Sequence, residues 1–286
     1  LENRLTLHRN SEKSHVSFDT DYYIDLLKQN VLSGNQGAVH RFPEIRYSVS
    51  ETKIADSPLL FQLDTNYVNF ARESLAYDKV TVVDSTRTIV TNPSATDNTA
   101  FNPSSGDIIR SGQRIDLQPK VSLPIRVGDY FDILPSLTYR HTQYYFNVNS
   151  ISGDFDSAPT RQFLLGEISN RTQFSAIYNS EDNLKKYKHE IEPEIAFSTV
   201  PWFYHTRSSF FGEDATVPSF KKEEPIGDDD FRGTRGIQFD YHDRILSRNV
   251  ITYTLNNKLI RKTITDNRAS YKQIAQVKLS QSYEPT

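Results

Sequence analysis

The strongest pattern in the sequence is a strict alternation of apolar and polar side chains between Arg114 and Val127. The odd positions from Ile115 to Val127 are all apolar, and the even positions from Arg114 to Arg126 are polar except for Pro124. A period of two is typical of a β-strand with one apolar and one polar face. The run of about 13 residues exceeds the ~5–6 of a usual globular strand. It suits a tilted strand that crosses a bilayer, which needs ~9–11 residues.

The alternation continues on the other side of a short Gly128-Asp129 turn. Apolar residues recur at every second position from Phe131 to Tyr139, and the positions between them are polar except for Leu134. The two runs predict a long hairpin whose outer face contacts lipid and whose inner face contacts water.

Similar segments along the chain predict an all-β fold, namely an antiparallel transmembrane β-barrel of the outer-membrane type with about ten strands. A further strand is expected at Gly236–Tyr241, and a helical turn is expected within residues 25–30. The other predicted strands are Asn3–His8, Val16–Ile24, His40–Glu51, Pro58–Arg72, Gln162–Tyr178, Tyr187–Val200, Val250–Lys262 and Tyr271–Tyr283.

The connections between these strands alternate in length. Outer-membrane barrels have short periplasmic turns and longer extracellular loops. The first strand then runs toward the periplasm, so we expect an odd number of strands before Leu1. A chain without methionine that begins at Leu1 is also expected to be a piece of a longer protein without its signal peptide. The long connections lie near 25–38, 73–112, 147–160 and 201–249, and those near 73–112 and 147–160 are rich in Asn, Ser, Thr and Pro.

The alternation assigns one set of residues to the lumen and another set to the lipid face. A Lys or Arg on the lipid face near the midplane costs ~2–4 kcal/mol, and the basic residues of the best alternating segments share the polar phase. Candidate lumen-facing residues are Arg114, Asp116, Lys120, Arg126, Arg140, Glu167, Arg171, Glu190 and Glu192. Candidate lipid-facing residues are Phe61, Leu63, Ile115, Leu117, Val121, Leu123, Ile191 and Ile195. Tyr144, Tyr145 and Trp202 are expected in interfacial girdles, with ordinary core packing as the alternative.

Composition narrows the class further. No apolar run approaches the ~18–20 residues of a membrane helix, and the 16 Tyr and 17 Phe suit barrel girdles. A net charge of −3 gives no electrostatic case for nucleic acid. With no cysteine there is neither a disulfide framework nor a thiol metal site.

Few residues invite a chemical interpretation. Glu190, Glu192 and Glu194 share one strand face while His189 lies on the other, so a polar wall is favoured over a metal or acid–base site. Residues 228–230 are three consecutive aspartates. We interpret them as part of a solvated loop and not as a Ca²⁺ site, because their spacing is not that of an EF-hand loop. The lumen arginines could bind phosphate or pair with carboxylates across strands, and we favour pairing. The sequence contains no catalytic or nucleotide-binding signature, so we predict no catalytic residue, metal or cofactor.

Several segments, in this order, resemble the barrel domain of the LPS-assembly protein family LptD (also called OstA or Imp). They are RFPEI (Arg41–Ile45), SPLLFQLDTNYVNFAR (Ser57–Arg72), RIDLQPKVSLP (Arg114–Pro124), LPSLTYRHTQYY (Leu134–Tyr145), KHEIEPEIAFSTVPW (Lys188–Trp202) and DRI (Asp243–Ile245). The resemblance spans nearly the whole chain.

The resemblance implies a ~26-stranded antiparallel barrel in the Gram-negative outer membrane that assembles lipopolysaccharide (LPS) into the outer leaflet. It implies a small LptE-like lipoprotein that plugs the lumen, and a periplasmic jelly-roll domain that receives LPS from a protein bridge. It also implies that LPS leaves between the first and last strands. We expect this chain to lack the jelly roll and those gate strands, and the family's cysteines have no match here.

Two other classes remain open from the sequence. A different outer-membrane barrel, such as a porin or ligand-gated transporter, would share the composition but not the family segments. A soluble β-sandwich or adhesin-like module would have shorter strands, near ~5–6 residues, and shorter loops.

Overall fold

The computed structural model describes residues 1–24, 26, 35–83, 86–90, 100–102, 107–148, 155–179, 185–206, 220–221, 239–243, 245–246, 249–265 and 268–285. Within these ranges the chain is built from β-strands with two 3₁₀ turns, η1 (Asn35–Gly37) and η5 (Tyr241–Asp243). No helix in this part of the chain is long and apolar enough to cross a membrane.

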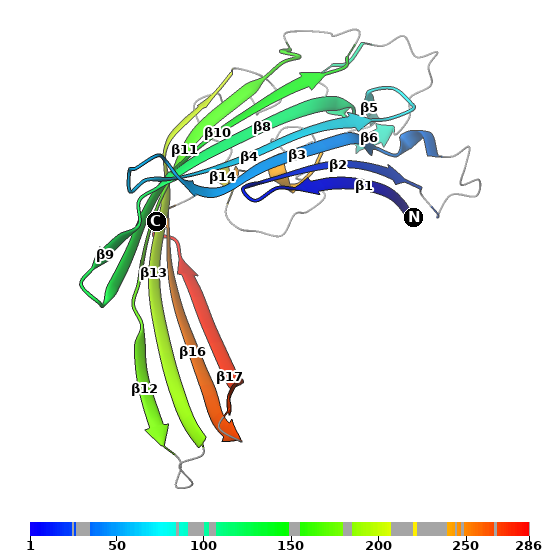
Figure 1. The fold of residues 1–286 in the computed structure, drawn as a ribbon. Helices are drawn as coiled ribbons and strands as arrows, with labels where there is room; N and C mark the ends of the chain where they lie inside the picture. Colours follow the sequence, from blue (N-terminus) through cyan, green and yellow to red (C-terminus); the bar gives the residue numbers. More distant parts are fainter. Residues whose placement is uncertain are drawn as a thin grey trace.

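The main sheet is an antiparallel meander in which most strands pair with the next one along the chain (Figure 1). Its order is β1-β2-β3-β4-β8-β10-β11-β13-β16-β17, with β9 on β10 and β12 on β13. β1 and β17 stand at the two edges, so the described sheet is open. The strands are β1 (Glu2–Asn10), β2 (Ser14–Tyr23), β3 (His40–Lys53), β4 (Leu60–Ala71), β8 (Gly112–Ser122), β9 (Ile125–Val127), β10 (Phe131–Phe146), β11 (Thr160–Arg171), β12 (Phe174–Asn179), β13 (Lys185–His205), β16 (Asn249–Thr265) and β17 (Arg268–Tyr283).

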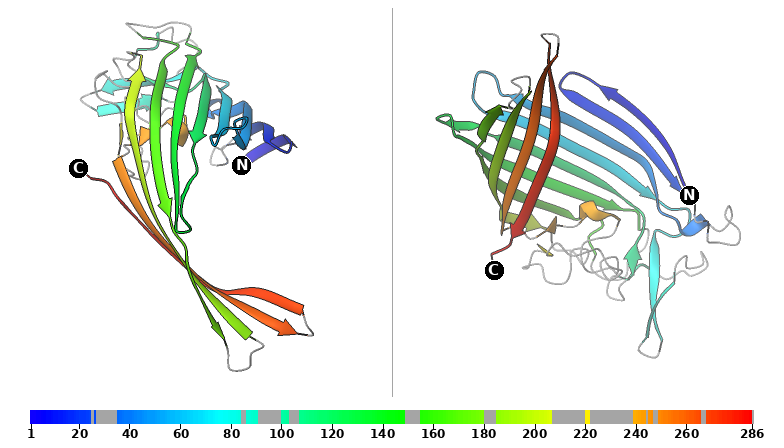
Figure 2. Two further views of the ribbon diagram at one scale, coloured as in Figure 1. Left: turned by 60° about the vertical axis from the view of Figure 1, so that its left-hand side comes forward. Right: turned by 90° about the horizontal axis from the view of Figure 1, so that it is seen from below.

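The strand register places polar residues of neighbouring strands on the same face of the sheet. Asp116 of β8 lies opposite Asn66 of β4 and Thr142 of β10, and residues directly opposite in an antiparallel pair project on the same face. The polar phases of neighbouring strands therefore join on the concave side of the curved sheet, where η5 lies (Figures 1 and 2). The opposite face carries exposed apolar side chains such as Val121 and Ile195.

A small second sheet lies within the connection 73–112, which the sequence predicted as a loop. It has the order β6-β5-β7, with β5 (Tyr77–Val83), β6 (Thr86–Val90) and β7 (Ile108–Ile109). Asp78 of β5 accepts ion pairs from Arg72 at 2.6 Å and from Arg110 at 2.7 Å. These contacts tie the small sheet to the ends of β4 and β8. The main hydrophobic cluster lies at the same end and contains Tyr77, Phe101, Ile109, Tyr144 and Phe146.

Two predicted strands are interrupted in the structure. The run from 115 to 127 divides into β8 and β9 at Leu123 and Pro124, because proline lacks the N–H that a ladder needs. The run from 162 to 178 divides into β11 and β12 at Thr172 and Gln173. Beyond the second break, β12, β13, β16 and β17 continue as a twisted ribbon (Figure 2).

Two other local predictions, a strand and a helical turn, fall partly or mostly on residues outside the described ranges. The strand expected at 236–241 is wrong where it can be compared, because 239–240 is a bend and Tyr241 begins η5. Residues 236–238 lie outside the described ranges. The same holds for the helical turn expected within 25–30, of which only Leu26 is described.

Candidate functional site

The concave face of the sheet is a mainly polar wall, with buried apolar side chains such as Val68 and Phe70 near one end of the strands. Over β1 to β4 and β8 it lines a cavity of about 580 Å³, to which Arg4, Asp19 and Arg46 contribute. Arg4 pairs with Asp19 at 3.0 Å, and Arg46 pairs with Glu44 at 2.7 Å. Cations and carboxylates of the wall therefore largely satisfy one another across neighbouring strands.

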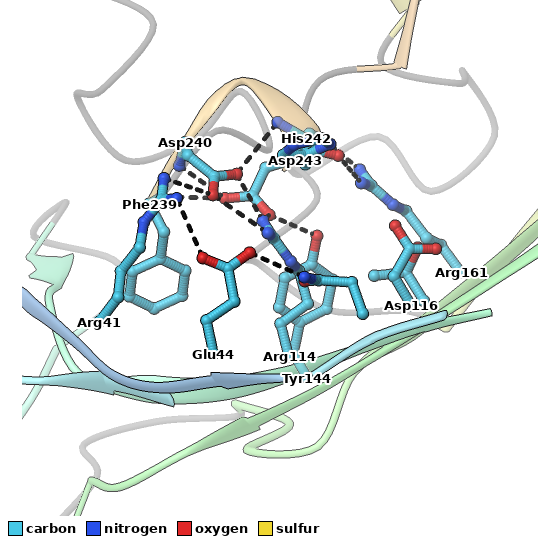
Figure 3. A network of polar contacts seen from close by, with 12 residues as sticks. Arg41, Glu44, Arg114, Asp116, Tyr144, Arg161, Phe239, Asp240, His242 and Asp243 are labelled. Atoms are coloured by element: carbon cyan, nitrogen blue, oxygen red, sulfur yellow. Dashed lines mark hydrogen bonds and ion pairs between the residues drawn. The ribbon is translucent and has the colours of Figure 1, made fainter. Parts of the chain in front are cut away.

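One segment from the long connection before β16 lies against this wall. Residues 239–243, here called the inner loop, include η5 and dock beside β8 (Figure 3). The Arg114 Nη1 donates to Asp243 Oδ1 at 2.7 Å and to Asp240 Oδ1 at 2.6 Å, and its Nη2 donates to Asp240 Oδ2 at 3.1 Å. Arg114 and Asp243 are each only 1% exposed. A buried arginine thus joins both carboxylates of the inner loop to the sheet.

β10 and β11 hold the other side of the inner loop. The Tyr144 hydroxyl donates to Asp243 Oδ1 at 2.8 Å. Arg161 donates to the backbone oxygen of Asp243, and its Nη2 donates to the His242 carbonyl at 3.1 Å. The Arg140 Nη2 donates to the same carbonyl at 2.8 Å. The wall therefore donates to both side-chain and backbone acceptors of the inner loop.

The inner loop is also closed on itself and packed against aromatic rings. Asp243 Oδ2 accepts the backbone N–H of Phe239 at 2.9 Å and that of Asp240 at 3.3 Å. The Phe239 ring stacks on Phe70 of β4, with centroids 4.1 Å apart and planes at 4°. Arg41 of β3 adds an ion pair to Asp240 at 3.1 Å.

The environment of Asp243 keeps its carboxylate ionised. Burial alone would raise the pKa of Asp243, but the charges of Arg114 and Arg161 and the hydrogen bonds from Arg114 and the Phe239 N–H outweigh it. The pKa of Asp243 is therefore lowered from its ordinary value.

Gly112 provides the close approach that the inner loop and its aromatic support need. A Cβ at this position would lie 2.9 Å from Phe146 Cδ1, 3.0 Å from the Tyr145 backbone oxygen and 3.3 Å from Phe239 Cζ. Gly112→Ala is expected to lower the free energy of unfolding by about 1–3 kcal/mol, because the backbone oxygen cannot move aside. Urea titration in micelles measures this change.

Gly166→Ala is the matched control for this prediction. A Cβ there meets only Thr199, at 3.7 Å or more, so the free energy of unfolding should change by less than about 1 kcal/mol. Equal losses for the two variants would contradict the packing argument.

Comparison with known proteins identifies the chain. A family model described as LptD, LPS transport system D, matches residues 1–285. The chain belongs to the LptD family. The family's proteins are outer-membrane β-barrels that act in LPS transport and assembly, and the predicted all-β fold and LPS-related function are confirmed at that level. A search of curated proteins found no match.

In the structure of this LptD-family chain, the predicted lumen-facing residues form two groups along the polar face. Arg114, Asp116 and Arg140 lie at the inner loop, where the Arg140 Nε donates to Asp116 Oδ2 at 2.9 Å. The others are spread toward the short-turn end of the strands. Their ion pairs are Lys120–Glu167 at 3.6 Å, Arg171–Glu194 at 2.9 Å, Lys188–Glu190 at 2.6 Å, Lys258–Glu192 at 3.0 Å and Arg126–Asp132 at 3.9 Å.

The predicted lipid-facing residues lie in the opposite strand phase. Ile115, Val121 and Ile195 are exposed, with Ile195 at 51%. Leu123 lies in the break between β8 and β9 and not within a strand. The contact of this face with lipid stays a prediction. The half-buried members of the set are Phe61, Leu63, Leu117, Leu123 and Ile191.

The girdle prediction is wrong for Tyr144. Tyr144 lies opposite Arg114 in the ladder, so its side chain shares the concave face and is 0% exposed. A tyrosine can occupy a polar phase because its hydroxyl finds an acceptor, here Asp243. Tyr145 and Trp202 are 45% and 43% exposed, and their place in a girdle stays a prediction.

Sequence reasoning missed the residues that complete the site. Asp240 and Asp243 follow no strand period, and Arg161 precedes the segment that was predicted as a strand. The one available signal was the DRI segment that begins at Asp243. No group of three or more histidines and carboxylates in the described ranges could hold a metal ion, and the aspartate run 228–230 lies outside those ranges.

Proposed function

We propose that the chain forms part of the barrel wall of a translocon that assembles LPS into the outer leaflet of a Gram-negative outer membrane. The observation that carries the proposal is the two-faced sheet, which has a concave polar wall and a convex apolar surface. Family membership supports the substrate. The strands then cross the membrane as a multi-pass barrel segment.

The two faces follow from this placement. The residues predicted to face the lumen line the path of hydrophilic groups, and those predicted to face lipid contact hydrocarbon. The connections near 73–112, 147–160 and 201–249 are then extracellular, and the whole chain is one partial barrel domain. We assign no catalytic residue, metal or cofactor to it.

The proposed partners are LPS, an LptE-like lipoprotein in the lumen and a periplasmic Lpt bridge. The cavity of about 580 Å³ beside the inner loop supports a polar occupant of the lumen. The bridge would act through the periplasmic jelly-roll domain that the family resemblance implies. Among the described strands, β1 and β17 form the two edges of the sheet, which supports pairing with further strands, because exposed edges invite strand addition.

Depletion of the full-length protein that contains this sequence is expected to lower LPS at the surface of intact cells. Antibody labelling of surface LPS measures the loss, and re-expression should restore it. Re-expression with Asp132→Asn, which changes an exposed residue near a short turn, is the matched control and should restore it too. Unchanged surface LPS on depletion would overturn the proposal.

A further inference from the structure

The short-turn ends of the last two hairpins carry an excess of positive charge. Residues 178–188 and 258–273 contain eight Lys or Arg against three Asp or Glu. Four of these cations, here called the basic tip, lie on neighbouring strands β13, β16 and β17. They are Lys186, Arg261, Lys262 and Lys272.

The basic tip sets like charges directly opposite one another. Lys186 lies opposite Lys262 in the ladder, in the phase of Glu190 that is predicted to face the lumen. Arg261 lies opposite Lys272 in the other phase, which is predicted to face lipid. Opposed residues have Cβ atoms ~4.5–5.5 Å apart, and like charges in that position repel. Within the described ranges no carboxylate oxygen lies within 4.0 Å of these four cations, so an external anion is the natural way to relieve the repulsion.

Among the described residues of the same strands, two ion pairs lie nearer to the rest of the main sheet than the four tip cations do. Glu190 pairs with Lys188 at 2.6 Å, and Glu192 pairs with Lys258 at 3.0 Å. The ribbon therefore neutralises its cations where it approaches the main sheet. The four tip cations lie beyond these pairs, toward the end of β13, β16 and β17 that projects from the rest of the sheet (Figure 1).

Tyrosines are interleaved with the basic tip. Tyr187 lies between Tyr178 and Arg261 in the ladder, and the Lys262 Nζ lies 5.6 Å from the centroid of the Tyr271 ring. Tyr178 and Tyr271 are both exposed. Tyrosine beside Lys and Arg is the composition of a bilayer interface, where the rings sit at the headgroup level.

Strand length places this end outside the hydrocarbon layer. β13 has 21 residues, which at ~3.3 Å per residue extend about 70 Å, and a strand tilted ~45° through a ~30 Å core uses only part of that length. The tip is at the short-turn end of the meander, which is periplasmic in an outer-membrane barrel.

We propose that Arg261 and Lys272, the pair of the basic tip in the predicted lipid-facing phase, bind anionic phospholipid headgroups of the periplasmic leaflet, with a lipid phosphate between the two cations. This inference rests on the membrane placement proposed above. Juxtamembrane Lys and Arg residues attract anionic lipid in this way, and the attraction is screened by salt. The tip thereby anchors the C-terminal hairpins of the chain to the inner surface of the bilayer.

Energy transfer from a donor at the tip tests the proposal, because the cysteine-free chain accepts a single label. Ser270→Cys of exposed β17 is labelled with a donor, and the protein is inserted in vesicles that contain headgroup-labelled phosphatidylglycerol or phosphatidylcholine at equal mole fraction. Transfer to phosphatidylglycerol is expected to be about twofold higher and to fall toward equality in high salt.

Charge-removing variants sharpen the result. The double variant Arg261→Gln and Lys272→Gln should give equal transfer to both lipids, whereas Lys53→Gln at the end of β3 should keep the difference. Equal transfer in the unsubstituted labelled protein would overturn the proposal, and displacement by polyglutamate in that case would point to an acidic protein partner instead. Absence of transfer to either lipid would contradict the membrane placement as well.

Discussion

Asp243→Ala is expected to release the inner loop and to lower the free energy of unfolding by about 3–5 kcal/mol. The substitution leaves Arg114 and Arg161 buried beside a lost carboxylate, and it removes the acceptor of the Tyr144 hydroxyl. Breaking a buried ion pair by removing one partner carries a cost of this size. Urea unfolding in micelles measures the stability, and limited proteolysis of the inner loop reports its release.

Asp132→Asn is the control for charge loss alone. Asp132 pairs with Arg126 at 3.9 Å, and both side chains are about 70% exposed. Exposed pairs contribute ~0–1 kcal/mol, so this variant should unfold almost as the unsubstituted protein does. A loss below about 1 kcal/mol for Asp243→Ala, with unchanged proteolysis, would contradict the role assigned to Asp243.

The contribution of Asp243 to the free energy of unfolding should decrease as the pH falls into the acid range. Because its pKa is lower in the folded protein than its ordinary value of 3.8, the carboxylate stabilises the fold fully above the unfolded pKa. That stabilisation is lost as the pH falls through the folded pKa. The stability difference between the unsubstituted protein and Asp243→Asn should therefore be constant near neutral pH and shrink only in strong acid. A difference that vanishes between pH 5 and 7 would contradict this sign.

Val121→Arg is expected to lower the stability of the bilayer-inserted protein by about 2–4 kcal/mol. Val121 is an exposed residue of the convex face near the middle of the β8–β9 run. A guanidinium there would enter hydrocarbon if that face contacts lipid. Guanidinium-induced unfolding from lipid vesicles measures the change.

Gln118→Arg provides the matched comparison on the same strand. Gln118 lines the polar cavity of the concave face, so an arginine there stays among polar groups and should cost less than about 1 kcal/mol. Equal losses for both variants, or a larger loss for Gln118→Arg, would show that the faces are assigned the wrong way round.

The sequence predicts the sheet well because its signal is periodic. The alternation from Ile115 to Val127 is enough to define both faces of β8, and the hairpin register then follows from the short turn. Pro124 shows the limit of this reasoning, since a break in the ladder leaves the alternation of side chains intact.

The site could be predicted only in part. Arg114, Asp116 and Arg140 were found because they follow the polar phase of long strands. Their partners Asp240 and Asp243 belong to a non-repetitive segment whose position depends on distant contacts, as in the bond from Arg114 across 129 residues to Asp243. Tyr144 was misplaced because residue type was given more weight than strand phase.

The central claim is that the apolar face of these strands contacts lipid while the polar face contacts water. Single cysteines from Asp116 to Val121, spin-labelled one at a time in the cysteine-free chain, test it in bilayers by collision with oxygen and with a water-soluble nickel complex. Labels at Leu117, Pro119 and Val121 should collide preferentially with oxygen, and labels at Asp116, Gln118 and Lys120 with nickel. A reversed phase, or equal accessibility along the strand, would contradict the account.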